Sequence, residues 1–210
     1  MKRHCLKNFL CLFVLVSVCQ LGVAAPSAPG IVVLGDSLSA AYGMQRAQGW
    51  IALLGEKLED EGYPHTLVNA SISGETTSGG LRRLPSLLQK HQPEIVIIEL
   101  GANDGLRALS INAMRANLEV MVEQSQTAGA QVLLLGMRIP SNYGPAYTED
   151  FHAAFASLAK AHDTALVDFF LAPVALQESY FQSDRIHPNP KAQPLLLEHV
   201  WPTLKPLLEE

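Results

Sequence analysis

The fold of this chain is decided by the stretch Ile31-Val32-Val33-Leu34-Gly35-Asp36-Ser37-Leu38-Ser39. A run of β-branched and other apolar residues that ends at a glycine predicts a buried strand followed by a sharp turn. In open α/β sheets, ligands bind outside the carboxyl ends of the strands. Ser37 is therefore placed for chemistry, although an ordinary turn in which Asp36 or Ser37 caps a helix explains the same composition.

The rest of the chain alternates short apolar runs with longer segments of helical period, which is the pattern of a parallel sheet with crossover helices. Its 210 residues, 48% hydrophobic and 17% charged, suit one globular domain. The sequence predicts an α/β, three-layer doubly wound fold of flavodoxin-like type with a five-stranded parallel sheet. The expected strands are 31–34, 66–69, 95–100, 131–135 and 165–169. The expected helices are 50–61, 79–91, 112–128, 149–162 and 191–208, with long loops at 102–111 and 138–148.

The first 27 residues have the features of a secretory signal peptide. Lys2, Arg3 and Lys7 precede the apolar run 9–18, and small residues follow up to Ser27. We therefore expect residues 1–27 to be a signal peptide, with an approximate cleavage site, and residues 28–210 to be a single domain. The protein is expected to be exported, periplasmic or secreted, with no stable membrane anchor after processing. An uncleaved anchor and, more weakly, a lipoprotein site at Cys19 are the alternatives.

The composition excludes several classes of function. All three cysteines, Cys5, Cys11 and Cys19, lie in the leader, so the mature domain has no disulfide and no thiolate nucleophile. A covalent catalyst must then be an oxygen nucleophile. The leader also holds three of the 15 Lys and Arg residues and no acid, so the remaining 12 face 20 acidic residues, a formal charge of −8. Because phosphate binding depends on clustered basic residues, nucleic acid is an unsuitable partner.

Three of the expected strand ends carry groups that suit acyl transfer. Ser37 follows the first strand, Gly74 follows the second and Asn103 follows the third. A serine that attacks a carbonyl creates an oxyanion, which a backbone N–H at a glycine and an asparagine amide can stabilise. The alternatives are a plain turn glycine and an asparagine in an Asx-turn.

His187 is the best candidate for the general base among the seven histidines. It lies in Asp184-Arg185-Ile186-His187, just before the last expected helix, where the alternation returns the chain to the strand ends. Asp184 can accept a hydrogen bond from one ring nitrogen while the other nitrogen faces Ser37. The rival pair His162-Asp163 is poorly arranged, because adjacent helical residues point in different directions. No Gly-x-Ser-x-Gly or His-Glu-x-x-His motif is present, and we expect neither metal nor cofactor.

Four sequence blocks together resemble the SGNH hydrolases, also called GDSL hydrolases, over residues 30–205. The resemblance implies a hydrolase fold without the usual nucleophile elbow, with catalytic residues Ser37, Asp184 and His187. It also implies an oxyanion hole formed by the Ser37 N–H, the Gly74 N–H and the Asn103 side chain. Ala102 departs from the glycine that is common there, so the resemblance implies the mechanism but not the fine specificity. The matching blocks are Gly35-Asp36-Ser37-Leu38-Ser39, Gly74, Gly101-Ala102-Asn103-Asp104 and Asp184-Arg185-Ile186-His187-Pro188.

Within that family the chain is similar to exported arylesterases, lysophospholipases and acyl-CoA thioesterases. The resemblance implies a serine esterase that hydrolyses acyl esters and thioesters through an acyl-enzyme, and we expect it to act as a monomer on a small-molecule substrate. Apolar residues of the two long loops are candidates for binding the acyl chain. They are Leu106, Leu109, Ile111, Ile139 and Tyr143, with Tyr147 beside them.

Two alternatives remain open at this point. A carbohydrate O-acetylesterase would prefer acetyl groups and aromatic platforms, for which only Trp50 and Trp201 are available as tryptophans. A non-catalytic binding module would use Ser37 and Asn103 only to hydrogen-bond a ligand.

Overall fold

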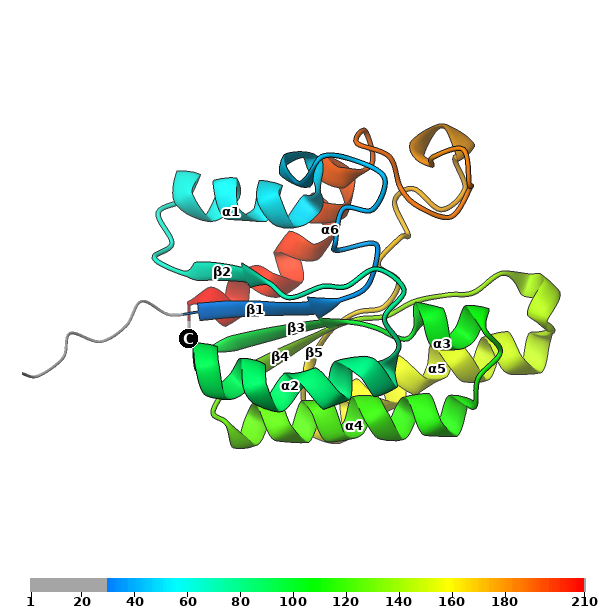
Figure 1. The fold of residues 1–210 in the computed structure, drawn as a ribbon, viewed down its shortest axis with the longest axis horizontal. Helices are drawn as coiled ribbons and strands as arrows, with labels where there is room; N and C mark the ends of the chain where they lie inside the picture. The colour runs from blue at the N-terminus through cyan, green and yellow to red at the C-terminus, as the bar shows by residue number, and fades with distance from the viewer. Residues whose placement is uncertain (1–29, 210) are drawn as a thin grey trace, which may run out of the picture.

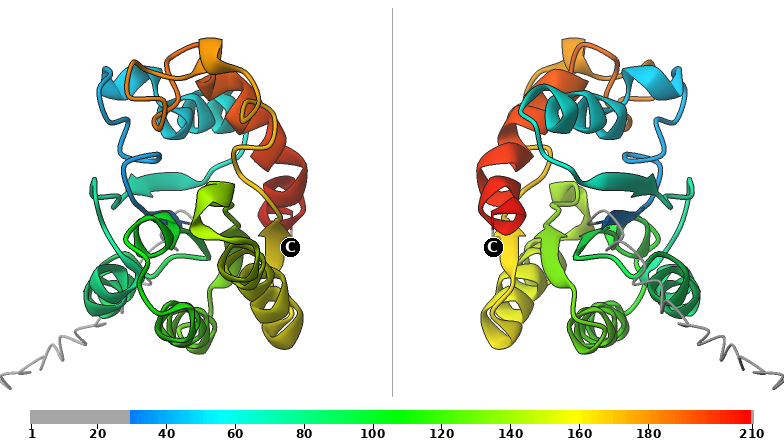
Figure 2. Two further views of the ribbon diagram at one scale, coloured as in Figure 1. Left: turned by 90° about the vertical axis from the view of Figure 1, so that its right-hand side faces the viewer. Right: turned by 90° about the vertical axis from the view of Figure 1, so that its left-hand side faces the viewer.

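The computed structural model describes residues 30–209, so the expected signal peptide lies outside the described residues. A five-stranded, all-parallel sheet has the order β2-β1-β3-β4-β5. Figures 1 and 2 show α1 and α6 on one face of it and α2, α4 and α5 on the other. The expected three-layer, doubly wound fold is confirmed. The strands are β1 (Gly30–Gly35), β2 (Thr66–Asn69), β3 (Ile95–Glu99), β4 (Gln131–Leu135) and β5 (Ala165–Val167).

The helices follow the strands in alternation, as the apolar periodicity predicts. The α-helices are α1 (Trp50–Asp60), α2 (Thr77–His91), α3 (Ala102–Leu106), α4 (Ile111–Thr127), α5 (Pro145–His162) and α6 (Gln193–Leu204). The described residues also form four short 3₁₀-helices, of which the last directly follows α6: η1 (Arg46–Gln48), η2 (Ser141–Tyr143), η3 (Glu178–Tyr180) and η4 (Lys205–Leu208). Among residues 30–209, no helix combines the length and the apolar character that crossing a membrane requires.

Burial of the central strands explains their apolar composition. Every residue of β3 is buried, and in β1 only Gly30 is partly exposed. Parallel strands covered by helices on both faces need side chains that are apolar in both directions. Glu99 is the exception, a carboxyl group buried at the end of the apolar run Ile95–Ile98.

Several expected boundaries are wrong by one to a few residues. The segment 102–111, expected to be a loop, begins with the short helix α3, because Gly101 turns the chain with a positive φ of 118°. α5 begins at Pro145 rather than at 149, since proline is well accommodated in the first turn of a helix. The last helix is shorter than expected, and its final turn is the 3₁₀-helix η4.

Gly136 allows a close approach between the ends of β4 and β5. Its N–H donates to the Val167 carbonyl over 2.8 Å, and its carbonyl accepts from the Phe170 N–H over 2.8 Å. A Cβ atom on Gly136 would press into the backbone carbonyl of Asp168. We therefore expect Gly136→Ala to lower the free energy of unfolding by about 1–3 kcal/mol, measured by urea denaturation.

The matched control is Gly55→Ala in α1, where a new Cβ would lie 3.8 Å from the Leu67 side chain, an ordinary contact. Alanine is the better helix former, so this variant should be as stable as the wild type or more stable. Equal stability of Gly136→Ala and wild type would contradict the close-approach argument.

Candidate active site

The turn that follows β1 presents Ser37 at the carboxyl edge of the sheet. The Asp36 carboxylate accepts from the Leu38 N–H over 3.0 Å, and the Ala40 N–H donates to the Asp36 carbonyl over 3.0 Å. Residues 37–43 form turns and not a helix, so Asp36 fixes a turn rather than capping a helix. The Ser37 hydroxyl is left to face the loop that carries His187.

Ser37, His187 and Asp184 form a continuous hydrogen-bonded line. The Nε2 atom of His187 lies 2.9 Å from the Ser37 Oγ, and its Nδ1 atom lies 2.7 Å from the Asp184 Oδ2. Asp184 and His187 are three residues apart, whereas Ser37 is 150 residues from His187. This geometry suits a serine nucleophile, a histidine base and an acid that fixes the histidine tautomer.

The chain around Asp184 holds its carboxylate in the ionised form. Its Oδ1 atom accepts from the His187 N–H over 3.0 Å and from the Ile186 N–H over 2.9 Å, a tight turn in which Arg185 has a positive φ of 59°. The hydrogen bond from the His187 N–H lowers the pKa of Asp184 to about 2, and the Ile186 N–H and the imidazole add to this effect.

Gln182 connects the loop that carries His187 to the turn that carries Ser37. Its side-chain amide donates to the Tyr42 carbonyl over 2.8 Å and to the Pro188 carbonyl over 3.2 Å, and its N–H donates to the His187 carbonyl over 2.8 Å. The Tyr42 ring also lies against the His187 ring, with the centroids 4.4 Å apart. Sequence reasoning missed both residues, because neither belongs to a motif and their contacts span about 140 residues.

Two of the three predicted oxyanion donors lie in the connections that follow β2 and β3, on either side of Ser37. Asn103 lies in the first turn of α3, and its amide donates to the Asp36 Oδ2 over 2.8 Å. Gly74 has a positive φ of 79° in the loop after β2, and its carbonyl accepts from Arg107 over 2.9 Å. Because β1 lies between β2 and β3, these loops border the turn of Ser37. The Asn103 amide thus bonds across to the Asp36 carboxylate, next to Ser37 in the chain.

A buried pair of acids lies beneath the turn. Asp36 and Glu99 are each only 1% exposed, and the Glu99 Oε2 accepts from the Asp36 N–H over 3.2 Å and from the Ser39 hydroxyl over 2.8 Å. Burial raises the pKa of Asp36 to about 6, while burial and the nearby Asp36 charge raise the pKa of Glu99 well above its usual range. Glu99 was missed from the sequence, although an acid that ends the run Ile95–Ile98 is a visible signal.

The predicted acyl-binding residues are divided between surface and core. Leu109 is 44% exposed, whereas Ile139 is buried next to Gly105 and so offers little surface to a ligand. Tyr143 and Tyr147 donate to the carbonyls of Leu106 and Leu109, over 2.7 and 2.8 Å. Leu106 and Ile111 are partly buried against the core. The two tyrosines therefore brace the loop after α3.

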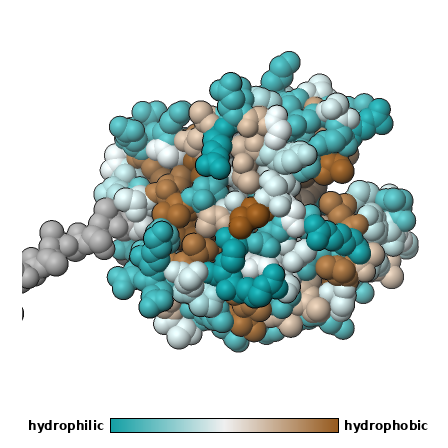
Figure 3. All heavy atoms as spheres, viewed as in Figure 1, coloured by the Kyte–Doolittle hydropathy of each residue, from teal (hydrophilic) through white to brown (hydrophobic). Residues whose placement is uncertain are grey.

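The surface at this end of the molecule is hollowed. Figure 3 shows a recess on the right-hand side, where the strands of Figure 1 end, and apolar residues border it. Several half-exposed apolar side chains lie in the loops that carry the candidate residues. They are Tyr42, Ile72, Leu109 and Ile186.

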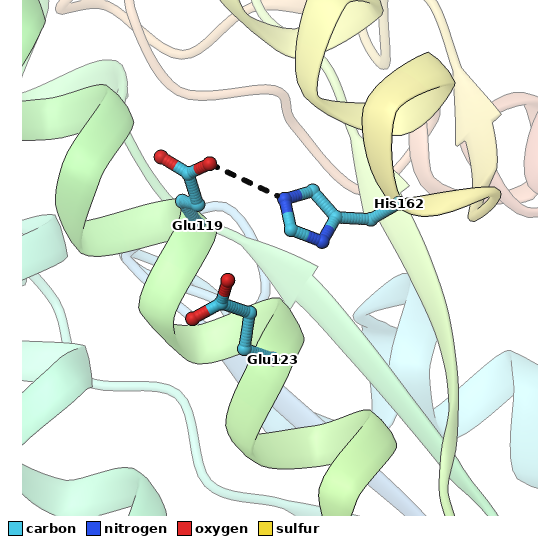
Figure 4. Close-up of side chains that lie close together, drawn as sticks. All are labelled: Glu119, Glu123 and His162. Atoms are coloured by element: carbon cyan, nitrogen blue, oxygen red, sulfur yellow. Dashed lines mark hydrogen bonds and ion pairs between the residues drawn. The ribbon is translucent and has the colours of Figure 1, made fainter.

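One group of metal-ligating side chains lies elsewhere among residues 30–209. Glu119 and Glu123 lie one turn apart on α4, and His162 lies at the end of α5 (Figure 4). Their ligand atoms are within 4.8 Å of one another, and the His162 Nε2 lies 3.4 Å from the Glu119 Oε1. Oxygen and imidazole ligands suit a divalent cation. The group lies toward the carboxyl ends of these helices, and thus toward the edge of the sheet opposite Ser37.

Comparison with known proteins gives the same family throughout. A model described as the GDSL-like Lipase/Acylhydrolase family matches residues 33–194. The chain is 52% identical over 182 residues to Esterase TesA of Pseudomonas aeruginosa, covering 87% of this chain and 90% of that protein. It is 42% identical over 184 residues to Thioesterase 1/protease 1/lysophospholipase L1 of Escherichia coli K12, covering 88% and 87%.

A similar solved structure is that of the psychrotrophic esterase EstA from Pseudoalteromonas sp., inhibited by monoethylphosphonate. It superposes with a TM-score of 0.82 at 44% sequence identity, covering 86% of this chain and 99% of that chain.

The low pKa of Asp184 predicts how pH affects stability. A carboxylate whose folded-state pKa is depressed stabilises the fold above its ordinary pKa of 3.8, and this contribution is lost as pH falls toward about 2. Asp184→Asn lacks this contribution at every pH. We therefore expect the difference in unfolding free energy between wild type and Asp184→Asn to narrow between pH 5 and pH 2, measured by urea denaturation. A constant difference across that range would contradict the assignment.

Proposed function

Because the chain belongs to the GDSL-like Lipase/Acylhydrolase family and is an ester-bond hydrolase, we propose that Ser37 is its nucleophile, His187 its general base and Asp184 the residue that orients His187. The observation that carries this proposal is the line from the Ser37 Oγ to His187 Nε2, at 2.9 Å, and from His187 Nδ1 to Asp184, at 2.7 Å. All three side chains belong to one chain, which supports action as a monomer.

Acylation begins when the Ser37 Oγ attacks the acyl carbonyl carbon and its proton passes to His187 Nε2. The carbonyl oxygen becomes an oxyanion, and the donors proposed for it are the Ser37 N–H, the Gly74 N–H and the Asn103 amide. When the tetrahedral intermediate collapses, the bond to the leaving group breaks and His187 protonates the departing alcohol or thiol.

Deacylation repeats the sequence with water. His187 removes a proton from the water that attacks the acyl-serine, and then returns that proton to the Ser37 oxygen as the free acid leaves. The contact of Tyr42 with the imidazole and the Asp184 hydrogen bond both restrict the ring, so that Nε2 faces Ser37 in each half-reaction. The reaction needs no group from outside the chain apart from water.

We propose medium-chain and long-chain acyl esters as the substrates, with thioesters as a further capability. The half-exposed apolar side chains in the loops around Ser37 support this class, since each buried methylene of an acyl chain contributes about 0.8 kcal/mol. The features of residues 1–27 support export to the periplasm or beyond. Acyl-CoA is cytoplasmic, so export favours lysophospholipids or other esters over acyl-CoA as the everyday substrate.

The two alternatives have less support. Trp50 is fully buried and Trp201 is 8% exposed, so neither offers a platform for a sugar. A binding module would not need the hydrogen bond between Asp184 and His187, which a serine hydrolase uses to orient its base.

Substitution of the reacting groups tests the triad and the oxyanion hole. Ser37→Ala should abolish hydrolysis and prevent labelling by a fluorophosphonate probe, because the covalent adduct forms on the nucleophile. Asn103→Ala should lower kcat on the order of 10² to 10³ with a smaller change in KM, as expected for the loss of one oxyanion donor. Both are measured on p-nitrophenyl butyrate.

Matched controls are Ser86→Ala on α2 and Asn112→Ala on α4, two exposed positions of the same residue types. Both should keep wild-type rates and labelling. Full esterase activity in Ser37→Ala would overturn the triad assignment.

The acyl-chain proposal predicts a dependence on chain length. The kcat/KM of the wild type should be higher on p-nitrophenyl octanoate than on p-nitrophenyl butyrate. Leu109→Ser should lower the kcat/KM on the octanoate by about tenfold and leave that on the butyrate nearly unchanged, since a few methylenes of the longer chain lose their apolar contact. Val120→Ser replaces an exposed apolar residue on the outer side of α4 and should leave the profile unchanged. A wild-type kcat/KM that does not change with chain length, or equal effects of the two substitutions, would contradict the proposal that the apolar loop residues bind the acyl chain.

A further inference from the structure

Asn103 is held in place through a single acceptor, the carboxylate of Asp36. Its Nδ2 atom donates to the Asp36 Oδ2 over 2.8 Å. An amide has two N–H bonds on the same nitrogen, so one of them can hold to Asp36 while the other is directed elsewhere. The direction of the second N–H therefore depends on where the Asp36 carboxylate lies.

Asp36 is in turn fixed by Glu99, from the end of the neighbouring strand. β1 and β3 pair so that Gly35 lies opposite Glu99. The Glu99 Oε2 accepts from the Asp36 N–H, which sets the Glu99 carboxyl group against Asp36, and a hydrogen bond between the two side chains contributes to the pKa shifts of both. Two buried carboxyl groups in contact cannot both ionise without a large electrostatic cost, so the pair shares one proton.

The surrounding groups decide which acid keeps the proton. Asp36 accepts from the Leu38 N–H and from the Asn103 amide, and both hydrogen bonds favour its ionised form. Glu99 is buried, and its Oε2 accepts from the Asp36 N–H and the Ser39 hydroxyl, so a proton on this carboxyl group belongs on the other oxygen. Burial raises the pKa of Glu99 well above its usual range, in agreement with a neutral acid.

The site around Glu99 is built to receive this carboxyl group. Ser39 donates to the Glu99 Oε2 over 2.8 Å while accepting from the Trp50 indole over 3.3 Å. A Cβ on Gly35 would lie 2.8 Å from the Glu99 Oε2, so only glycine leaves the carboxyl group this space. A buried leucine or methionine would fill the same place in an ordinary strand, and the polar contacts therefore require an explanation.

We propose that Glu99, as a neutral acid, donates a hydrogen bond to the Asp36 carboxylate and thereby positions the Asn103 amide for the oxyanion. Glu99 is a positioning residue in this arrangement, because it acts through Asp36 and does not touch the substrate. The neutral form also keeps a second negative charge away from the oxyanion that develops during acylation. This inference rests on the proposed role of Asn103.

The test compares two substitutions of similar size. Glu99→Gln keeps a donor toward Asp36 and an acceptor for Ser39, so its kcat should stay close to that of the wild type. Glu99→Met removes both, and its kcat should fall by about tenfold or more with little change in KM, a smaller loss than removal of the Asn103 donor itself. Rates are divided by the number of sites that a fluorophosphonate titrates, so that only folded enzyme is counted.

Ile98→Ala is the matched control for a weakened core, because Ile98 is buried beside Glu99 on β3 and makes none of these hydrogen bonds. It should lower the melting temperature and leave kcat per titrated site unchanged. Equal losses of kcat in Glu99→Gln and Glu99→Met, or wild-type kcat in both, would overturn the proposal.

A double-mutant cycle separates this inference from the proposed function. In an Asn103→Ala background, Glu99→Met should cause little further loss of kcat, because the donor it positions is already absent. The same fold-loss in both backgrounds would overturn the inference alone. If Asn103→Ala by itself leaves kcat unchanged, the proposed role of Asn103 in the oxyanion hole is wrong, and the inference that rests on it is wrong with it.

Infrared difference spectroscopy tests the protonation state of Glu99 directly and does not need the Glu99→Met variant, which could fail to fold. Wild type minus Glu99→Gln at neutral pH should contain the carbonyl band of a protonated carboxylic acid. A carboxylate band in its place would show that Glu99 is ionised and would overturn the proposal.

Discussion

The parallel pairing of β1 with β2 on one side and with β3 on the other is the constraint on which the site depends. Because the sheet order is β2-β1-β3, the turn after β1 lies between the loops after the other two strands. The register that sets Gly35 opposite Glu99 brings Asp36 within reach of both Glu99 and Asn103. A shift of one residue would exchange the faces of β1 and destroy these contacts.

The acids near Ser37 are controlled in opposite ways. Asp184 is partly exposed and is held ionised by backbone N–H groups, which lower its pKa. Asp36 and Glu99 are buried, and burial raises the pKa of both. One carboxylate thus faces the His187 imidazole at the surface, while burial favours the neutral form in the pair beneath the Ser37 turn. Environment, and not residue type, separates their roles.

Features that depend on neighbouring residues could be predicted from the sequence, whereas features that depend on contacts between residues far apart in the chain could not. The apolar runs predicted all five strands, and most clearly the buried strands β1, β3 and β4, because a parallel strand covered by helices must be apolar on both faces. Helix α3 was missed, since its five residues follow a positive-φ turn at Gly101 that periodicity cannot detect. Asp184 and His187 lie within one turn of chain and so left a local pattern. Gln182 and Tyr42 bind across about 140 residues, and no local pattern marks them.

The sequence by itself determined the order of strands and helices, the family resemblance and the identity of Ser37, Asp184, His187, Gly74 and Asn103 as candidates. These follow from local patterns of hydrophobicity and from short motifs. Only the tertiary structure decided that Ile139 is buried, that Gln182 joins the two loops and that Glu99 meets Asp36. Those outcomes depend on which strands are neighbours and in what register, which long-range packing determines and no short stretch of sequence contains.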